Sequence, residues 1–318
     1  MPLPTRLTEL LGIEHPILLA PMGSASGGAL AAAVTAAGGF GFVGSGYANS
    51  ATIRSEISVA GNARVGVGLV TWSLAERPEA LDAALEHAPP AVMLSFGDPT
   101  PYADRVRRAG SLLFCQVQSL EMARQAADAG ADVIIAQGRD AGGHSGSLRG
   151  TFGLVPAVVD AVAPIPVVAA GAVADGRGLA AALMLGADGV LMGTRFAASR
   201  ESLWSDALKR GAVAAAADDT LQTRVFDIVR GVAWPTHFPG RAVRNGFAER
   251  WHGREDELLE RRAEAEAGYD ATPADDLATR VLWAGEGVDL VADVPSARDI
   301  VERTVAEAER ALARRQPR

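Results

Sequence analysis

Short runs of consecutive apolar residues alternate with longer, alanine-rich segments through the first 200 residues of the chain. Uninterrupted apolar runs are typical of parallel strands, because such strands are buried on both faces. The pattern predicts eight strands, at residues 17–20, 40–43, 65–70, 91–96, 112–117, 133–136, 166–170 and 189–192. Helical segments lie between them, for example at residues 28–37, 119–129 and 178–185. Eight strands that alternate with helices predict an α/β fold, the (β/α)8 or TIM barrel.

The pattern changes after about residue 200, where strong β runs end and charged residues become frequent. Residues 249–266 are dense in Arg and Glu, which predicts a solvated helix face, and residues 299–315 predict an amphipathic terminal helix. We therefore expect a barrel formed by residues 1–200 with part of the C-terminal tail. Residues 201–318 are expected to form a C-terminal helical appendage that covers the barrel mouth, or alternatively an independent small domain.

Composition narrows the class of protein. A net charge of −8 argues against a nucleic-acid or anionic-membrane partner. The single cysteine, Cys115, excludes an internal disulfide and is expected to be a buried strand residue. No His or carboxylate cluster has metal-ligand spacing, so we expect no metal. The N-terminus lacks a basic region followed by an apolar core, and a cytoplasmic, soluble protein is the expectation.

The loop after the sixth predicted strand carries the most distinctive chemistry. Gln137 ends that strand, and Gly142, Gly143 and His144 follow within seven residues. Adjacent glycines let the backbone approach a flat ligand, because no Cβ intervenes. Imidazole can donate or accept a proton near neutral pH. We therefore predict a planar cofactor at this loop with His144 beside it; the alternative is a surface histidine or one that caps a carbonyl group.

The loops after the last two predicted strands are rich in small residues. Gly171 and Ala172 follow the seventh strand, and Gly193 and Thr194 follow the eighth. Barrels often bind phosphate here through backbone N–H groups, although small residues also simply suit tight turns. Asp175 is expected to cap the next helix rather than to act in catalysis. His237, in the aromatic loop at residues 234–240, is a weaker candidate for the mouth.

Four segments, at residues 16–22, 138–146, 166–176 and 192–196, together resemble the nitronate monooxygenase family, formerly called 2-nitropropane dioxygenases. The segments occur in family order and cover roughly residues 10–200. Flavin-dependent enoyl-ACP reductases and NADH:quinone reductases share the barrel and nearly the same motifs. The resemblance therefore specifies fold and cofactor more sharply than reaction.

The resemblance implies non-covalently bound FMN. His144 would be the catalytic residue, beside the isoalloxazine and the substrate. Gly68 falls where an Asn is common in the family, and Gln116 falls where a Lys is common. The residues implied to bind the cofactor are Ala20, Met22, Gly68, Gln116, Gln137, Gly142, Gly143, Ala170, Gly171, Ala172, Gly193 and Thr194.

The resemblance also implies a reaction, the oxidation of alkyl nitronates by O2 to carbonyl compounds and nitrite. The substrate would be a small nitronate or nitroalkane, and a homo-oligomer is possible. Three alternatives stay open: an FMN-dependent NAD(P)H oxidoreductase of quinone reductase or enoyl-ACP reductase type, a non-catalytic FMN-binding protein, and a flavin-free phosphate-sugar isomerase barrel.

Overall fold

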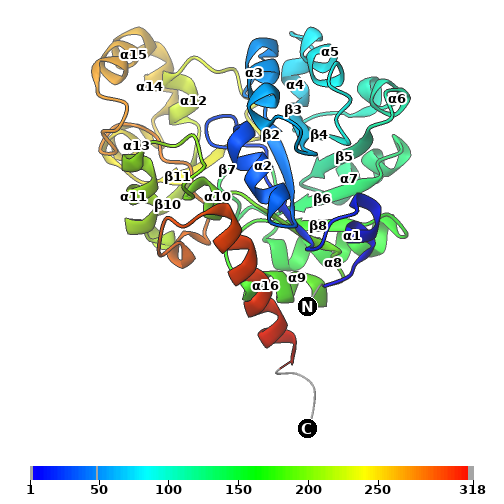
Figure 1. Ribbon diagram of the computed structural model, residues 1–318. Coiled ribbons are helices and arrows are strands. Elements are labelled where there is room, and N and C mark those ends of the chain that lie inside the picture. The colour runs from blue at the N-terminus through cyan, green and yellow to red at the C-terminus, as the bar shows by residue number, and fades with distance from the viewer. Residues whose placement is uncertain (1–2, 48, 314–318) are drawn as a thin grey trace.

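Eight parallel strands close into a barrel in the computed structural model, which describes residues 3–47 and 49–313 (Figure 1). The last strand of the barrel pairs with the first, Leu18 lying opposite Leu191. All eight predicted strands, and with them the predicted barrel, are confirmed. The strands are β1 (Ile17–Leu19), β2 (Phe40–Gly44), β3 (Gly66–Val70), β4 (Ala91–Ser95), β5 (Leu112–Val117), β6 (Val133–Gln137), β8 (Val167–Ala170) and β9 (Gly189–Met192).

Helices connect the strands, and local signals in the sequence set where they begin and end. Asp175 caps α9 (Gly176–Met184) as predicted, because its carboxylate accepts the backbone N–H groups of Arg177 and Gly178. Gly130 and Gly186 follow helices with φ of +83° and +90°, the left-handed conformation that favours glycine. The helices are α1 (Arg6–Leu11), α2 (Gly28–Ala36), α3 (Ser50–Ala60), α4 (Thr71–Leu74), α5 (Glu79–Leu85), α6 (Thr100–Arg108), α7 (Leu120–Asp128), α8 (Thr151–Val162) and α9 (Gly176–Met184).

Large side chains fill the barrel interior near the N-terminal ends of the strands. The rings of Phe40 and Phe42 meet edge to face at 5.1 Å, and Phe42 meets Phe114 at 5.4 Å. Gly66 makes room for Phe42, because a Cβ at this position would overlap the ring. Leu7 of α1 belongs to the same buried cluster and helps to close this end. Any open space inside the barrel is therefore left at the carboxyl ends of the strands.

The segment after residue 200 contains strands as well as helices. The sequence predicts a helical appendage at residues 201–318, but β10 (Thr220–Thr223) and β11 (Gly240–Val243) pair there in antiparallel fashion, and β7 (Gly143–His144) joins β11 as a third strand. These strands are short and partly polar, so they carry no strong β signal. The remaining elements are α10 (Thr194–Ala197), α11 (Asp206–Ala214), β10 (Thr220–Thr223), α12 (Val225–Val229), β11 (Gly240–Val243), α13 (Gly246–Trp251), α14 (Glu255–Glu260), α15 (Arg262–Ala271) and α16 (Ala297–Ala313).

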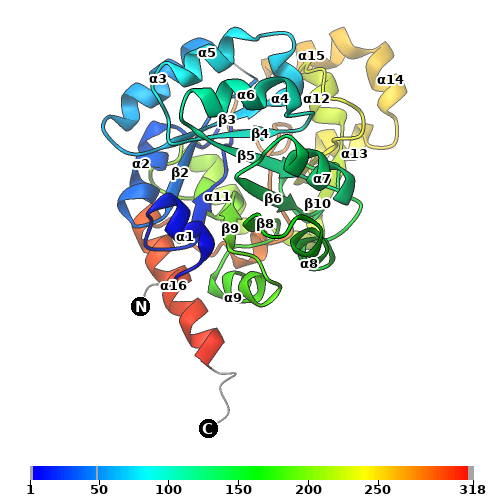
Figure 2. The ribbon, with the colours of Figure 1, turned by 90° about the vertical axis from the view of Figure 1, so that its right-hand side faces the viewer.

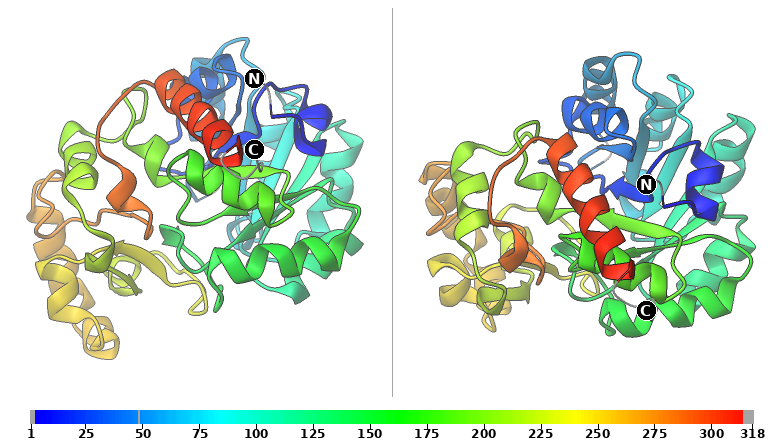
Figure 3. Two further views of the ribbon diagram at one scale, coloured as in Figure 1. Left: turned by 90° about the horizontal axis from the view of Figure 1, so that it is seen from below. Right: turned by 60° about the horizontal axis from the view of Figure 1, so that its bottom comes forward.

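The charged stretch at residues 249–266 spans three helices rather than one. The chain turns at Gly253, whose φ is +81°, and α13, α14 and α15 gather at one side of the barrel (Figure 1, Figure 2). The terminal helix α16 agrees with the prediction and lies along α9 outside the barrel (Figure 3); Arg314 and Arg315 lie outside the described residues. Within the described residues, no helix has the length and apolar character needed to span a membrane.

Candidate active site

A cavity of about 800 Å³ opens at the carboxyl ends of the barrel strands. Residues 201–318 complete its wall with Arg230, Trp234, Trp283, Gly285 and Gly287, which the sequence analysis did not identify. Every predicted site residue lines this cavity: Ala20, Met22, Gly68, Gln116, Gln137, Gly142, Gly143, His144, Ala170, Gly171, Ala172, Gly193 and Thr194.

His144 is held on two sides at the cavity wall. Its ring stacks on Trp234, with centroids 3.6 Å apart and planes inclined by 8°. Nε2 lies 2.9 Å from Oδ2 of Asp227, and the two side chains are only 9% and 4% exposed. An ionised carboxylate only accepts hydrogen bonds, so this contact assigns a proton to Nε2. Nδ1 makes no hydrogen bond within residues 3–47 and 49–313, which leaves it for a ligand.

Asp227 is the main functional candidate that the sequence analysis missed. It comes from α12, where it is the one charged residue in the run Val-Phe-Asp-Ile-Val. Its Oδ1 is buried and has no hydrogen-bond partner among the described residues. A lone acid inside an apolar run signals a buried carboxylate, and a buried carboxylate needs a partner. That signal was present in the sequence, although nothing there connected it with His144.

Two neutral glutamine side chains, Gln116 and Gln137, line the cavity, and Gln118 lies behind them in the same hydrogen-bond network. Gln137 donates from Nε2 to the His144 carbonyl oxygen at 3.0 Å, which fixes the orientation of its amide. Its Oε1 accepts from Nε2 of Gln118 at 2.8 Å and from Nε2 of Gln116 at 3.2 Å. These bonds tie β5 and β6 to the strand that carries His144. No lysine lies among the described residues that line the cavity.

Gly68 is coupled to its neighbour Pro21. A Cβ at position 68 would overlap the Pro21 ring, and both residues line the cavity. An asparagine could not occupy this position unless Pro21 moved. The glycine at residue 68 is therefore a steric requirement of this chain.

The two loops of small residues lie against a segment from the end of the chain. Gly171 and Ala172 have φ of +116° and +53°, so their backbones turn sharply after β8. A Cβ on Gly287 would overlap the Ala172 carbonyl, which shows how closely the segment approaches this loop. The Thr194 hydroxyl accepts the backbone N–H of Gly285 at 3.2 Å. His237, by contrast, is not among the lining residues and packs on Phe238, with ring centroids 4.1 Å apart.

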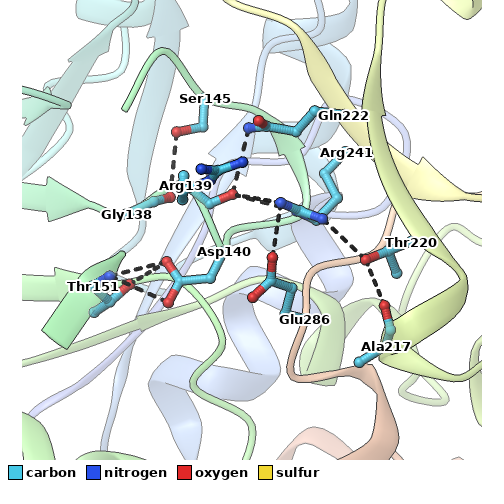
Figure 4. A network of polar contacts seen from close by, with 10 residues as sticks. All are labelled: Gly138, Arg139, Asp140, Ser145, Thr151, Ala217, Thr220, Gln222, Arg241 and Glu286. Atoms are coloured by element: carbon cyan, nitrogen blue, oxygen red, sulfur yellow. Dashed lines mark hydrogen bonds and ion pairs between the residues drawn. The ribbon is translucent and has the colours of Figure 1, made fainter. Parts of the chain in front are cut away.

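A network of polar contacts holds the loop after β6, at residues 138–146, to residues 201–318 (Figure 4). The buried guanidinium of Arg241 donates to the Arg139 carbonyl at 3.2 Å and to the Thr220 hydroxyl at 3.1 Å, and it pairs with Glu286 at 2.8 Å. Desolvation lowers the pKa of the Arg241 guanidinium, although Glu286 opposes the shift. Asp140 accepts the backbone N–H of Thr151 at 3.0 Å. The loop is thus anchored from both sides.

Replacing Arg241 with methionine is expected to lower the free energy of unfolding by about 2–3 kcal/mol, because several hydrogen bonds to a buried charge are lost together. Urea denaturation followed by circular dichroism measures this change. Arg298→Met removes an exposed ion pair with Glu302 and is expected to change stability by less than about 1 kcal/mol. Equal effects of the two substitutions would contradict an anchoring role for Arg241.

Comparison with curated proteins places this geometry among known enzymes. The chain is 37% identical to a (3aS,4S,5R,7aS)-5-hydroxy-7a-methyl-1-oxo-octahydro-1H-indene-4-carboxyl-CoA dehydrogenase of Mycobacterium tuberculosis, over 71% of this chain and 65% of that protein. The match therefore spans slightly less than two thirds of that relative. The nitronate monooxygenase of Neurospora crassa is 33% identical, over 93% of this chain and 89% of its own length.

Solved structures of related enzymes match nearly the whole length of the chain. FabK from Thermotoga maritima is 34% identical with a TM-score of 0.85, covering 98% of both chains. The nitroalkane oxidase from Streptomyces ansochromogenes is 30% identical with a TM-score of 0.80, covering 98% of this chain and 99% of that one. The barrel, its cavity and these relatives together identify the protein as an oxidoreductase. The family model for nitronate monooxygenase matches residues 4–66 and 71–307, and the chain belongs to this family of flavoproteins.

Proposed function

We propose that the protein is an FMN-dependent nitronate monooxygenase, which oxidises alkyl nitronates with O2 to carbonyl compounds and nitrite. The observation that carries the proposal is the position of His144. Its imidazole is oriented by Asp227 and Trp234 at the wall of a cavity whose remaining surface is largely small, apolar or amide. The described lining contains neither cysteine nor lysine, and His144 is its one histidine, which suits chemistry performed by a bound cofactor.

The size of the cavity and its small lining residues support FMN as the cofactor. A volume of about 800 Å³ falls within the usual range for cofactor sites. At Gly193, a Cβ would project toward Met22 Sδ at 3.4 Å and Ala20 at 3.8 Å, within the cavity wall, so the glycine keeps this space open. We assign the phosphate to the backbone of residues 170–172 and 193–194. Met22, Gly68, Gln116, Gln137, Gly142 and Gly143 would line the ribityl chain and ring.

Bound FMN would supply the redox chemistry, which no side chain of the site can perform. His144 would do one of two jobs according to the form of the substrate. A protonated imidazole would orient the nitronate oxygens and offset their charge. A neutral imidazole, with Nε2–H bound to Asp227, would remove the α-proton of a neutral nitroalkane through Nδ1. Residues 1–200 would hold the cofactor, and residues 201–318 would cover the mouth and exclude water.

A second candidate function is that of an NAD(P)H-dependent reductase on the same flavin barrel. The similarity to FabK over 98% of the chain favours it. The two functions differ in which compound reduces the flavin. The visible spectrum of the purified protein, mixed without oxygen with ethyl nitronate, NADH or NADPH, separates them. Bleaching by the nitronate alone supports the monooxygenase, and rapid bleaching by a nicotinamide supports the reductase.

Replacing Gly142 with alanine is expected to weaken FMN binding by at least about tenfold, the cost of one steric misfit of 1–3 kcal/mol. A Cβ at this position would overlap the backbone of Ala284 and Gly285, so the segment beside the proposed phosphate loops would be displaced. Fluorescence titration of the apoprotein with FMN measures the change. Gly153→Ala is the matched control, because its Cβ would meet no atom within 4 Å, and unchanged affinity is expected. Equal affinity in both variants would contradict the assigned site.

A further inference from the structure

Helix α12 brings a second charged group to the cavity. Asp227 contacts His144, and Arg230, three residues later at the end of the same helix, lines the cavity wall. Nη2 of Arg230 donates to the Tyr47 hydroxyl at 2.7 Å. Its guanidinium carbon also lies 5.9 Å from the centre of the Trp283 ring. Among the described residues, these two neutral neighbours are the only partners recorded for the Arg230 side chain.

The charge of Arg230 has no counter-ion in the described part of the protein. The other arginine of the cavity wall, Arg280, has a partner: its Nη1 lies 3.5 Å from Oδ1 of Asp270. Its guanidinium carbon lies 4.4 Å from the centre of the Tyr269 ring. Asp227 is engaged by His144. A guanidinium that faces an aromatic ring and forms no ion pair with a described carboxylate is stabilised strongly by a bound anion. The wall around Arg230 is therefore prepared for an anionic ligand.

Arg230 and His144 border the same aromatic wall. Trp234, which stacks on His144, donates from Nε1 to the Tyr47 hydroxyl at 3.4 Å. Trp283 lies 5.1 Å from the His144 ring and also faces Arg230. The cation and the imidazole thus share one indole neighbour, Trp283, and line one cavity. A ligand beside His144 experiences the field of Arg230.

We propose that Arg230 and Tyr47 form the anion-recognition site for the substrate, a specificity rather than a proton-transfer role. The planar guanidinium fork matches two oxygens on one nitrogen or carbon atom, the geometry of a nitronate. The protein accordingly selects the anionic nitronate over the neutral nitroalkane of the same carbon skeleton. The substrate part of this inference rests on the proposed nitronate monooxygenase function, whereas the anion site itself does not.

Two measurements on the holoenzyme test the site separately from the reaction. The first is calorimetric titration with sodium nitrate, an unreactive planar oxyanion. Arg230→Met is expected to weaken nitrate binding by at least about tenfold, and Tyr47→Phe to weaken it less, as expected for loss of charged and neutral hydrogen bonds respectively. The second is the ratio of kcat/KM for ethyl nitronate to kcat/KM for nitroethane. This ratio is expected to fall by at least about tenfold in Arg230→Met and less in Arg230→Lys, which keeps the charge but loses the fork.

The outcomes separate the two ideas. If Arg230→Met loses nitrate binding and the wild type turns over neither ethyl nitronate nor nitroethane, the anion site is retained and the nitronate reaction is rejected. Unchanged nitrate binding and an unchanged substrate ratio in Arg230→Met overturn the anion site. Should Arg230→Met lose its FMN or its fold, Arg230→Lys and Tyr47→Phe carry the test, and wild-type nitrate affinity and substrate ratio in both also overturn it.

Discussion

Replacing His144 with alanine is expected to remove most turnover and to leave FMN bound. The imidazole contacts Trp234, Asp227 and Trp283, all from residues 201–318, whereas the proposed cofactor contacts come chiefly from backbone and amide groups of the barrel loops. Loss of one positioned acid–base group costs a factor of roughly 10²–10⁴ in rate. Steady-state turnover of ethyl nitronate, measured together with the visible absorbance of bound flavin, gives both quantities.

His237→Ala is the matched control for this experiment. His237 lies in the loop that carries Trp234, but it is not among the cavity-lining residues. Its replacement is expected to leave turnover within about twofold of the wild type, the usual scale for a substitution outside a functional site. Unchanged turnover in His144→Ala would sink the assignment of His144. A preparation without flavin would instead move His144 from catalysis to cofactor binding.

The barrel could be predicted from the sequence because its strands are buried on both faces. Uninterrupted apolar runs such as Val133–Gln137 have few structural alternatives. The predicted site residues of the barrel then lie together for a topological reason. The carboxyl ends of parallel strands in a closed barrel meet at one end, so Met22, Gln137 and Gly193 face the same cavity although they are far apart in sequence.

The part of the site contributed by residues 201–318 could not be predicted in the same way. Its elements are short, and their positions depend on tertiary contacts rather than on periodicity. β7 consists of two residues and exists only because β11 pairs with it. Asp227, Arg230 and Trp234 reach His144 or its surroundings through that packing. No spacing rule in the sequence links them to residue 144.

Replacing Asp227 with asparagine is expected to reduce turnover by a factor of roughly 10²–10⁴, because His144 loses the carboxylate that sets its tautomer, while stability stays unchanged or rises slightly. The carboxylate accepts the Nε2 proton of His144 and can do nothing else, whereas an amide can also present its NH₂ group and favour the other tautomer. Stability is retained because Oδ1 has no partner in the described structure, so the change removes a buried charge without breaking a second bond.

The tautomer itself supplies a readout that a purely structural role would not change. Nitrogen-15 chemical shifts of His144 are expected to place the proton on Nε2 in the wild type and to show a share of the Nδ1-protonated neutral tautomer in Asp227→Asn. Asp293→Asn should show the opposite combination of effects. Arg303 and Arg195 hold the pKa of the Asp293 carboxyl below its usual value. The ionised carboxylate therefore stabilises the fold at a pH above the pKa of the unfolded state, and this stabilisation is lost as the pH falls through the lowered pKa of the folded state. Asp293 is not among the cavity-lining residues, and its replacement is expected to lower stability and to preserve turnover. If both variants lose stability and activity in parallel, Asp227 supports the fold and does not orient His144.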